Sequence, residues 1–245
     1  MTSPNEDFAE PNDELTATVR VAGEWYEYEE ALRRQNRVVV PNQPYFDELL
    51  AECVAGLKEW IEPRQVFRAR LMPPGQDELP FARSQIGAPP ASSAGGGRLN
   101  PPGISCLYAA LDAETAIAEV RPWINARVTV GAFETVGRVR VVDLSDLEST
   151  SRRRAAFAAY MMQRPTHRDD TIAYVATQYL AEHLKSHGAD GVIYGSSLRR
   201  GGTNAAFFRL DVAKPVATQL WQVGSVIYHS FELTDMKPEH SKSYA

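Results

Sequence analysis

Three side chains suited to chemistry fall within residues 95–119, namely Arg98, Tyr108 and Glu119. Arg98 follows three consecutive glycines and precedes a proline pair, in a turn where a guanidinium could bind phosphate oxygens beside exposed backbone N–H groups. The Tyr108 ring offers a stacking surface on a short predicted strand. A cation, a ring and an isolated acid point to a nucleotide-like ligand and to chemistry at a sugar carbon. Composition alone explains the segment equally well as a flexible Gly/Ala/Ser loop that ends in a proline turn.

Glu119 is the single carboxylate in an apolar part of a predicted helix, with Ala116, Ile117 and Val120 around it. Such a carboxylate could stabilise an oxocarbenium-like sugar carbon and accept a hydrogen bond from a ribose hydroxyl. A lone carboxylate is enough where the leaving group is already cationic, as nicotinamide is in NAD. The alternative is a helix-end carboxylate that is satisfied by Arg121 or by a backbone group.

Two further segments carry polar side chains at useful spacings. Arg68 and Arg70 lie two residues apart on a predicted strand and therefore share one face, as a clamp for a pyrophosphate or as an exposed basic edge. The polar glycine turn over 194–204 follows a predicted strand and contains Ser196, Ser197 and Asn204. Its hydroxyls and the Asn204 amide suit a ribose or an amide, and the alternative is a simple hairpin loop.

Several common site types are excluded or disfavoured. Dinucleotide binding by a Rossmann fold needs G-x-G-x-x-G, whereas the glycines at 95–97 are consecutive, and no P-loop is present. The turn after Tyr194 lacks the G-x-S-x-G elbow of a serine nucleophile. His183 and His187 stand at a helical spacing that can hold zinc, but without H-E-x-x-H or a further ligand cluster, so we expect no metal.

Composition sets the broad class. The chain has 245 residues and a formal net charge of −5, and hydrophobic residues make up 44% of it. This length allows one large domain with a substantial core, while the negative balance argues against direct nucleic-acid binding, which needs a basic face. No apolar run reaches the roughly 18–20 residues of a membrane helix, so no membrane contact is expected.

The two cysteines and the N-terminal residues indicate the expected cellular compartment. Cys53 and Cys106 lie among apolar neighbours, as buried small hydrophobes do, and are not expected to form a disulfide. The acidic N-terminus lacks the basic and apolar regions of a signal peptide. We therefore expect a cytoplasmic protein. The sequence leaves open whether the chain forms a homo-oligomer.

The chain divides into four predicted parts. They are a disordered acidic N-terminus over 1–18, a helical extension over 19–63, the main domain over 64–232 and a flexible tail over 233–245. In the extension, apolar residues at three- and four-residue spacing predict an amphipathic helix over Tyr45–Ile61, and a second helix is expected around Glu27–Gln35.

The main domain alternates between strand-like and helix-like patterns. Strands are predicted at Val66–Leu71, Ser105–Ala109, Arg127–Phe133, Val139–Asp143, Gly191–Tyr194, Ala205–Leu210, Val216–Leu220 and Val226–Ser230. Beyond the helix that carries Glu119, helices are predicted over Arg152–Gln163 and Thr171–His187, and residues 72–103 are predicted to be a long loop. Without repeats and with an irregular order of strands and helices, the class is α+β with a mainly antiparallel or mixed sheet.

In this order, the segments resemble the RES domain, a family named for an Arg, a Glu and a Ser in its motifs. The matching strings are FRAR (67–70), GRLNPPG (97–103), LY (107–108), TAIAEVRP (115–122), YVATQ (174–178), DGVIYGSS (190–197) and GTN (202–204). The similarity covers about residues 64–212. It implies an ADP-ribosyltransferase-like fold and an enzyme that degrades NAD, by phosphorolysis in the best-defined cases.

The resemblance also implies roles for individual residues. Glu119 matches the motif glutamate, and Tyr108 matches the ring that stacks against nicotinamide. Arg68 and Arg98 match phosphate-binding arginines, and Arg70 competes with Arg68 for the first role. The motif serine is matched better by Ser196 than by Ser197.

Partners and alternatives follow from the same resemblance. RES domains are toxins that are neutralised by an Xre-type antitoxin. The alternative to antitoxin pairing is a free-standing protein, or one restrained by its own extension. Two features favour this alternative, the residues that precede the domain and the long segment over 72–96. The nearest other activity is transfer of ADP-ribose to a macromolecule. The alternative from a different functional class is a non-catalytic binding module with a vestigial NAD site.

Overall fold

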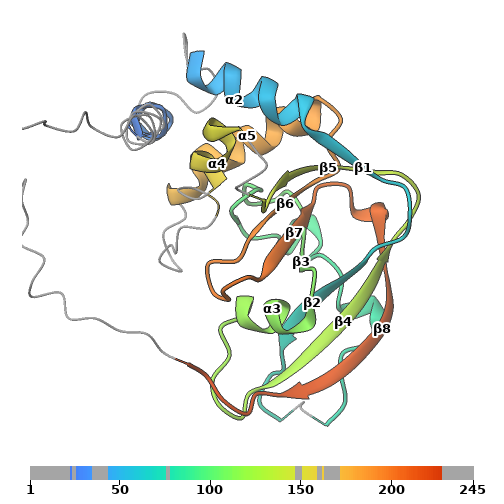
Figure 1. The fold of residues 1–245 in the computed structure, drawn as a ribbon. Coiled ribbons are helices and arrows are strands. Elements are labelled where there is room, and N and C mark those ends of the chain that lie inside the picture. The colour runs from blue at the N-terminus through green and yellow to red at the C-terminus, as the bar shows by residue number, and fades with distance from the viewer. Residues whose placement is uncertain are drawn as a thin grey trace, which may run out of the picture.

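The computed structural model describes residues 23, 26–34, 44–75, 78–146, 151–158, 162 and 172–227. Within them, one sheet contains eight strands, in the spatial order β1 (Leu57–Trp60), β5 (Val139–Leu144), β6 (Gly191–Gly195), β7 (Thr203–Phe207), β3 (Leu107–Ala110), β2 (Gln65–Leu71), β4 (Arg127–Thr135) and β8 (Ala213–Gln222). Neighbouring strands are antiparallel except β5 and β6, which are parallel (Figure 1).

Helices account for the rest of the α+β class. They are a helical segment over 26–34, α2 (Pro44–Ala55), α3 (Ala113–Glu119), α4 (Arg152–Phe157) and α5 (Val175–Ser186). The helical segment between β5 and β6 supplies the crossover that a parallel strand pair requires. The sequence therefore predicted the fold class correctly. Among the described helices, none is both long and apolar enough to cross a membrane.

Most predicted elements are confirmed. The first five predicted strands are present with ends that differ by no more than two residues, and β7 and β8 correspond to the next two. The helix before β6 begins as a 3₁₀ turn at Ile172–Tyr174. The predicted strand at Val226–Ser230 is wrong in its described part, because residues 226–227 have no regular structure. The predicted termini over 1–18 and 233–245 lie outside the described residues, as do residues 159–161 and 163 of the helix predicted over Arg152–Gln163.

The helix predicted over Tyr45–Ile61 is wrong at its C-terminal end. It stops at Ala55, the chain turns at Gly56, and Leu57–Trp60 form β1 on β5. Gly56 lies close to the Arg154 side chain, since a Cβ added at Gly56 would lie 2.4 Å from its Nη1. Trp60 continues the apolar spacing of the helix, yet its ring packs inside the sheet against Phe207 with centroids 6.3 Å apart. Tertiary packing thus overrides the helical pattern.

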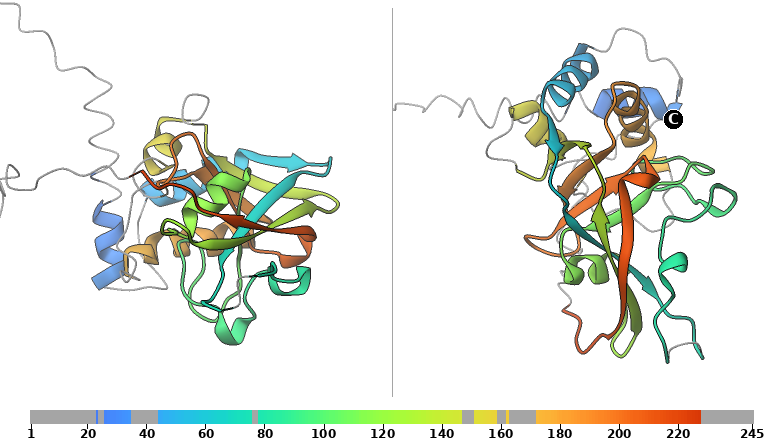
Figure 2. Two further views of the ribbon diagram at one scale, coloured as in Figure 1. Left: turned by 90° about the horizontal axis from the view of Figure 1, so that it is seen from below. Right: turned by 90° about the vertical axis from the view of Figure 1, so that its right-hand side faces the viewer.

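The sheet curls around its own apolar core. Each of the eight strands in the described part contributes at least one residue to a single buried cluster. Its members are Trp60, Val66, Ile86, Leu107, Ala109, Phe133, Val139, Val141, Ile193, Ala205, Phe207, Val212 and Ala213. Both views of Figure 2 show the long strands β4 and β8 side by side as one strongly twisted ribbon. This cluster therefore fills the inner face of the sheet, and the opposite face is called the outer face below.

Two separate covers lie on that outer face. At one end, α2, α5 and the 26–34 helix pack on β5–β7, and the Tyr28 ring stacks on Phe46 at 4.9 Å between centroids. In the middle, α3 packs on β2, β3 and β4 through small residues such as Ala69, Ala110 and Ala116. The outer face is left uncovered between these two groups of helices.

The connection over 72–103 is largely irregular, as predicted. It contains two short 3₁₀ turns, Arg83–Gln85 and Ala91–Ser93, and Figure 2 shows it in teal along one side of the sheet. Ile86 is completely buried in the sheet core, and Leu99 is buried against the helical cover. Ile86 and Leu99 therefore hold the second half of the connection against the domain.

Candidate active site

A cavity of about 730 Å³ opens between α3 and the helical cover, and β2 contributes residues from both of its faces to the wall. Strands β2 and β3 pair at one position, Phe67 with Ala110, and the cavity lies where the two strands separate. The β2 residues 67–71, the 96–98 loop, the end of α3 and the strands β3, β6 and β7 all contribute to its wall. This size lies within the range of about 300–1,000 Å³ that is typical of ligand pockets.

Glu119 is held at the cavity wall by two donors from distant parts of the chain. The Ser196 hydroxyl and the Asn204 amide Nδ2 both donate to its Oε1 atom, each at 2.7 Å. Among the described residues, none donates to Oε2. The Glu119 residue is exposed to solvent. One carboxylate oxygen is therefore fixed, while the other remains accessible to a ligand.

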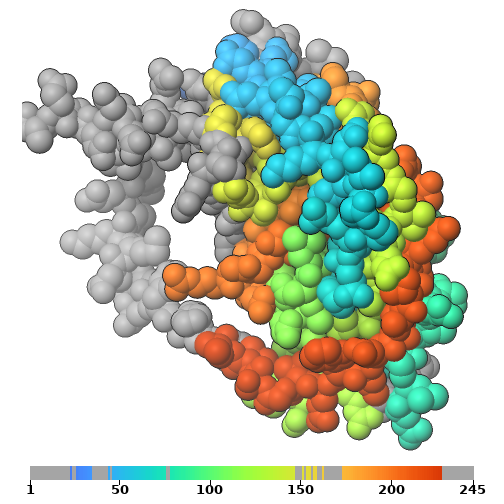
Figure 3. All heavy atoms as spheres, turned by 45° about the vertical axis from the view of Figure 1, so that its right-hand side comes forward, coloured from blue at the N-terminus to red at the C-terminus, as the bar shows by residue number. Residues whose placement is uncertain are grey.

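The turn over 196–202 contacts both ends of α3. Ser196 reaches Glu119 at the C-terminal end, while Arg199 Nη1 donates to Oδ1 of Asp112 at 3.1 Å and to Oγ1 of Thr115 at 2.9 Å. Asp112 is the N-cap of α3 and accepts from the Thr115 backbone N–H at 2.7 Å. In Figure 3 this orange turn lies against the green α3 region.

The same turn is stabilised internally. The Ser196 hydroxyl accepts from the backbone N–H groups of Leu198 and Arg199, each at 3.1 Å. Added at Gly202, a Cβ would lie 2.5 Å from Oγ1 of Thr115, so the turn approaches α3 as closely as a glycine permits. The short helix and the turn therefore form one unit that positions Glu119.

The glycine-rich segment over 95–104 is an ordered loop built around Asn100. Its Nδ2 donates to the carbonyls of Gly95 and Ile104, at 2.9 and 2.7 Å, and its Oδ1 accepts from the Tyr108 hydroxyl at 2.7 Å. The same hydroxyl accepts from the Leu99 N–H at 2.8 Å. Burial raises the pKa of Tyr108 well above its usual value, so the hydroxyl stays protonated. The ring is therefore held rigidly where it lines the cavity.

The N-terminal part of α5 anchors this loop from the other side. Gln178 Nε2 donates to the Gly97 carbonyl at 2.7 Å, and the Thr177 hydroxyl donates to the carbonyl of Arg98. The Arg98 guanidinium lies over the Tyr174 ring, 5.2 Å from its centroid. These contacts present the Arg98 side chain to the cavity on a fixed backbone.

The two arginines of β2 differ in their surroundings. Arg68 Nη1 donates to the Tyr108 carbonyl at 2.8 Å and so bridges the two strands that separate at the cavity. Burial and the neighbouring charge of Arg70 lower the Arg68 pKa. The Arg70 guanidinium donates to the Gln85 carbonyl and lies 4.5 Å from the centroid of the Phe81 ring. Arg68 therefore belongs to the buried wall of the cavity, and Arg70 to its outer edge.

Two buried polar atoms of the wall lack partners within the described residues, Nε of Arg68 and Oδ1 of Asn204. One is a donor and the other an acceptor, and an unpaired buried polar group is costly. Both residues line the cavity. A ligand with a phosphate oxygen and an amide or hydroxyl donor could satisfy them.

The RES domain family model matches residues 66–226, which is more than half of the chain. The chain belongs to the RES domain family. The match begins in β2, ends after β8, and includes every residue that lines the cavity. RES domains are associated with NAD-using toxins, which are typically paired with an antitoxin. No curated protein matches the chain.

All of the predicted site residues meet at one place in this RES domain. Seven of the eight line the cavity, namely Arg68, Arg70, Arg98, Tyr108, Glu119, Ser197 and Asn204. The eighth, Ser196, donates a hydrogen bond to Glu119, and this contact distinguishes Ser196 from Ser197. Their roles on a ligand remain predictions.

Sequence reasoning missed several residues of the wall. Tyr174 and Tyr194 contribute aromatic surface, Arg121 contributes a further cation, and Trp123, whose side chain is 57% exposed, lies at the rim. Burial raises the pKa of Tyr194. Arg121 and Tyr194 lie in strings that match the family, so their types were visible in the sequence, whereas their place in the cavity wall depends on the fold.

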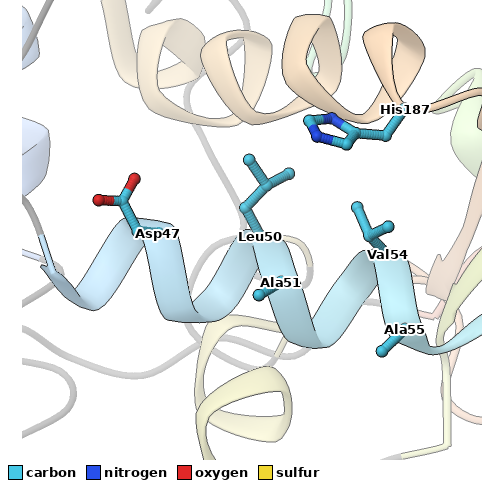
Figure 4. Close-up of a pocket in the computed structure, with 6 residues that line it drawn as sticks. All are labelled: Asp47, Leu50, Ala51, Val54, Ala55 and His187. Atoms are coloured by element: carbon cyan, nitrogen blue, oxygen red, sulfur yellow. The ribbon is translucent and has the colours of Figure 1, made fainter.

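The histidine pair and the second hollow lie away from this cavity. The His183 ring packs against Phe46 and Tyr179, and His187 Nδ1 lies 2.8 Å from the His183 carbonyl. In the described part of the chain, no group of three or more His, Cys, Asp or Glu residues could hold a metal ion. Figure 4 shows His187 above a hollow of about 430 Å³ between α2 and α5, lined by Asp47, Leu50, Ala51, Val54 and Ala55. Its mainly apolar wall offers no chemistry.

The two cysteines are free and buried, as predicted. Burial is the largest cause that raises the pKa of each thiol, to about 12 for both Cys53 and Cys106. Both thiols are therefore protonated at neutral pH and are poor nucleophiles. Neither belongs to the lining of the cavity.

Proposed function

We propose that this RES domain cleaves the nicotinamide–ribose bond of NAD. The observation that carries the proposal is the fixed carboxylate of Glu119, whose Oε1 accepts from both Ser196 and Asn204 in a cavity lined by arginines. Its Oε2 atom is free to accept a ribose hydroxyl and to stabilise positive charge as it develops at the sugar carbon. The fold is then expected to be ADP-ribosyltransferase-like.

The remaining residues fit the two ends of a dinucleotide. Arg68 and Arg98 would bind the pyrophosphate, with Arg70 at the outer edge of the same group. Tyr108 would present its ring to nicotinamide, since its hydroxyl is held on both sides and the ring has a defined orientation. The unpaired Oδ1 of Asn204 would accept from a ribose hydroxyl or from the nicotinamide amide.

The chemistry needs one carboxylate and no acid. The bond between the ribose carbon and the ring nitrogen breaks with both electrons going to nicotinamide, which leaves as a neutral molecule. Phosphate or water then bonds to the same carbon, giving ADP-ribose 1″-phosphate or ADP-ribose. Because the leaving group loses its charge, no residue has to protonate it.

The direct test follows nicotinamide release from NAD by the purified chain, with and without phosphate. Glu119→Gln keeps the size of the side chain and its hydrogen-bond acceptor but removes the charge, so we expect a loss of about a hundredfold or more. Glu134→Gln, an exposed carboxylate on β4 outside the cavity, is the matched control and should match the unmodified chain. Absence of nicotinamide in both conditions, from a folded protein, would refute the proposal.

Labelled NAD separates the related activities. Label in a small product supports NAD degradation, whereas label bound to a macromolecule would indicate ADP-ribosyl transfer. Binding of NAD without turnover would indicate a binding module. Since RES domains are typically paired with an antitoxin, an Xre-type protein that blocks nicotinamide release is the partner class to test first.

A further inference from the structure

One end of the cavity carries an exposed aromatic ring. Trp123 lines the cavity, yet 57% of the residue is exposed to solvent. It belongs to none of the three apolar clusters of the described chain, and within the described residues no other aromatic ring packs on it. A large apolar ring at the rim of a pocket is a surface on which a flat group of a ligand can stack.

The backbone that carries Trp123 is fixed by hydrogen bonds. Residues 120–126 connect α3 to β4, and the Ala126 N–H donates to the Trp123 carbonyl at 3.0 Å. The Asn125 N–H donates to the Val223 carbonyl at 2.8 Å, and the Val223 N–H donates to the Ala126 carbonyl at 3.0 Å. Ala126 and Val223 are buried. The exposed ring therefore stands on a turn that is anchored to the end of β8.

Two residues with left-handed backbone lie on either side of Trp123. They are Arg121, with a φ of 48°, and Asn125, with a φ of 67°. No other non-glycine residue in the described ranges has a positive φ. This conformation is uncommon for residues with a side chain, and such outliers gather at ligand sites, where the surrounding structure holds them. The backbone strain of the described chain is therefore concentrated in the turn that presents the ring.

The order of the strands separates Trp123 from the residues proposed for nicotinamide. Across the sheet the order is β6, β7, β3, β2, β4 and β8 (Figure 1). Asn204 and Tyr108 belong to β7 and β3, and Arg68 and Arg70 belong to β2, the next strand. The turn of Trp123 is joined to β4 and β8, on the far side of β2. The arginines of β2 thus lie between the nicotinamide side of the cavity and the exposed ring.

Resting on the proposed function, we infer that Trp123 stacks on the purine base of the ligand and so makes the cavity selective for purine dinucleotides. The pyrophosphate of NAD lies between its nicotinamide and adenine ends, so a ligand whose phosphates lie at β2 extends its adenine toward Trp123. The other aromatic residues of the wall are Phe67 on β2 and three tyrosines on the nicotinamide side, Tyr108, Tyr174 and Tyr194. A purine offers a larger face for stacking than a pyrimidine, so it gains more from the ring.

Isothermal titrations with unreactive probes test the inference. ADP contains the purine base and two phosphates but no nicotinamide, UDP replaces the purine by a pyrimidine, and inorganic pyrophosphate has no base. We expect Trp123→Ala to weaken ADP binding about fivefold or more, to narrow the preference for ADP over UDP, and to leave pyrophosphate binding within about twofold. Trp123→Phe should keep most of the ADP affinity, because it keeps a ring. Ile124→Ala is the matched control, since Ile124 is the next residue, is 52% exposed and does not line the cavity.

Nicotinamide release gives a second measurement on the same variants. Trp123→Ala should raise the KM for NAD about fivefold or more and leave kcat within about twofold, because the base contributes binding that is equal in the ground state and the transition state. With nicotinamide mononucleotide, which lacks the adenosine, the same variant should match the unmodified chain.

The outcomes for the inference and for the proposed function are separate. An unchanged ADP affinity in Trp123→Ala would overturn the inference, as would an equal loss of pyrophosphate affinity or a failure of the unmodified chain to bind ADP. ADP binding that depends on Trp123, in a chain that releases no nicotinamide, would support the inference and refute the proposed function. Nicotinamide release with an unchanged KM for NAD in Trp123→Ala would support the proposed function and overturn the inference.

Discussion

Asn204 donates its Nδ2 proton to Oε1 of Glu119 at 2.7 Å, although the two residues lie 85 positions apart in the chain. Ser196 donates to the same oxygen from the turn that follows β6, the strand that pairs with β7. Two donors on one oxygen orient the carboxylate without occupying the other oxygen. The position of the proposed catalytic group is therefore determined by β6 and β7 as much as by its own helix.

We predict that Ser196→Ala and Asn204→Ala each lower the rate of nicotinamide release. A hydrogen bond to a charged group contributes about 1.5–3 kcal/mol, so each change should cost about tenfold or more. Because both donors act on one oxygen, we expect the two losses in rate not to be additive in the double variant. Rates at saturating NAD measure this in a double-mutant cycle.

Ser197→Ala is the matched comparison for that cycle, since Ser197 lines the cavity without a hydrogen bond to Glu119. A loss in Ser197→Ala equal to that in Ser196→Ala would contradict the assignment of Ser196 as the motif serine. Circular dichroism of each variant shows that the fold is retained.

Arg199 is predicted to be a positioning residue. It ties the turn that carries Ser196 to Asp112 and Thr115 at the start of α3. Arg199→Ala should lower kcat several-fold and leave the KM for NAD nearly unchanged, because the ligand itself does not lose a contact. Arg199→Lys should restore part of the rate. A rise in the KM for NAD without a change in kcat would instead indicate that Arg199 contacts the ligand.

The N-cap of α3 predicts a pH dependence of stability. Burial raises the pKa of Asp112, but hydrogen bonds from Thr115 and the charge of Arg199 outweigh it, so the pKa lies below its ordinary value of about 3.9. A depressed pKa contributes stability above the unfolded value, and this contribution is lost as the pH falls through the folded value. Asp112→Asn should therefore be less stable than the unmodified chain at pH 7.

Urea unfolding at several pH values measures this difference. The free energies of unfolding of the two proteins should converge as the pH falls below about 4, where the carboxyl becomes protonated. A difference that stays constant from pH 7 to the acid limit would show that the side chain caps the helix independently of its charge.

Gly97 is predicted to be essential for the loop that carries Arg98. Added at this position, a Cβ would lie 2.6 Å from the Tyr108 hydroxyl and 2.8 Å from Oδ1 of Asn100, so Gly97→Ala must displace the hydrogen bond between them. Binding of NAD should weaken about tenfold or more. Gly95→Ala is the control, since nothing lies within 4 Å of a Cβ there. Isothermal titration of both variants with NAD checks the contrast, and equal affinities would contradict it.

The thiols are predicted to be unreactive in the folded protein. Cys53 and Cys106 are buried, and their raised pKa values of about 12 keep the thiolate population small at pH 8. Iodoacetamide should modify neither until urea unfolds the chain, as mass spectrometry can show. Rapid modification of one cysteine in buffer would indicate that its surroundings open locally.

The residue types of the site could be predicted from the sequence, because each lies in a short string with its own local pattern. Arg68 is on an alternating strand, Arg98 in a glycine turn, and Glu119 at a helix end. The choice between Ser196 and Ser197 could not, since it depends on which hydroxyl faces α3 across the β6–β7 turn. The place of Arg121 in the cavity wall could not be predicted either, since it depends on the fold.

The end of the helix predicted over Tyr45–Ile61 was wrong because a distant strand pairs with these residues. Trp60 and Ile61 continue the three- and four-residue spacing of α2, so local periodicity favours one long helix. The pairing of β1 with β5 is a contact between residues 57–60 and 139–142, which no local window contains. A pattern in neighbouring residues cannot show where pairing with a distant strand ends a helix.

Strand β1 precedes the region that matches the RES family, yet it completes one border of the sheet. Its outward residues Lys58 and Glu59 are exposed, and charges of this kind discourage edge-to-edge pairing between molecules. A chain that began at Val66 would instead present the free backbone of β5, a six-residue strand with buried valines. Such an edge is a template for self-association. We therefore expect the segment ahead of the family domain to protect the domain against aggregation.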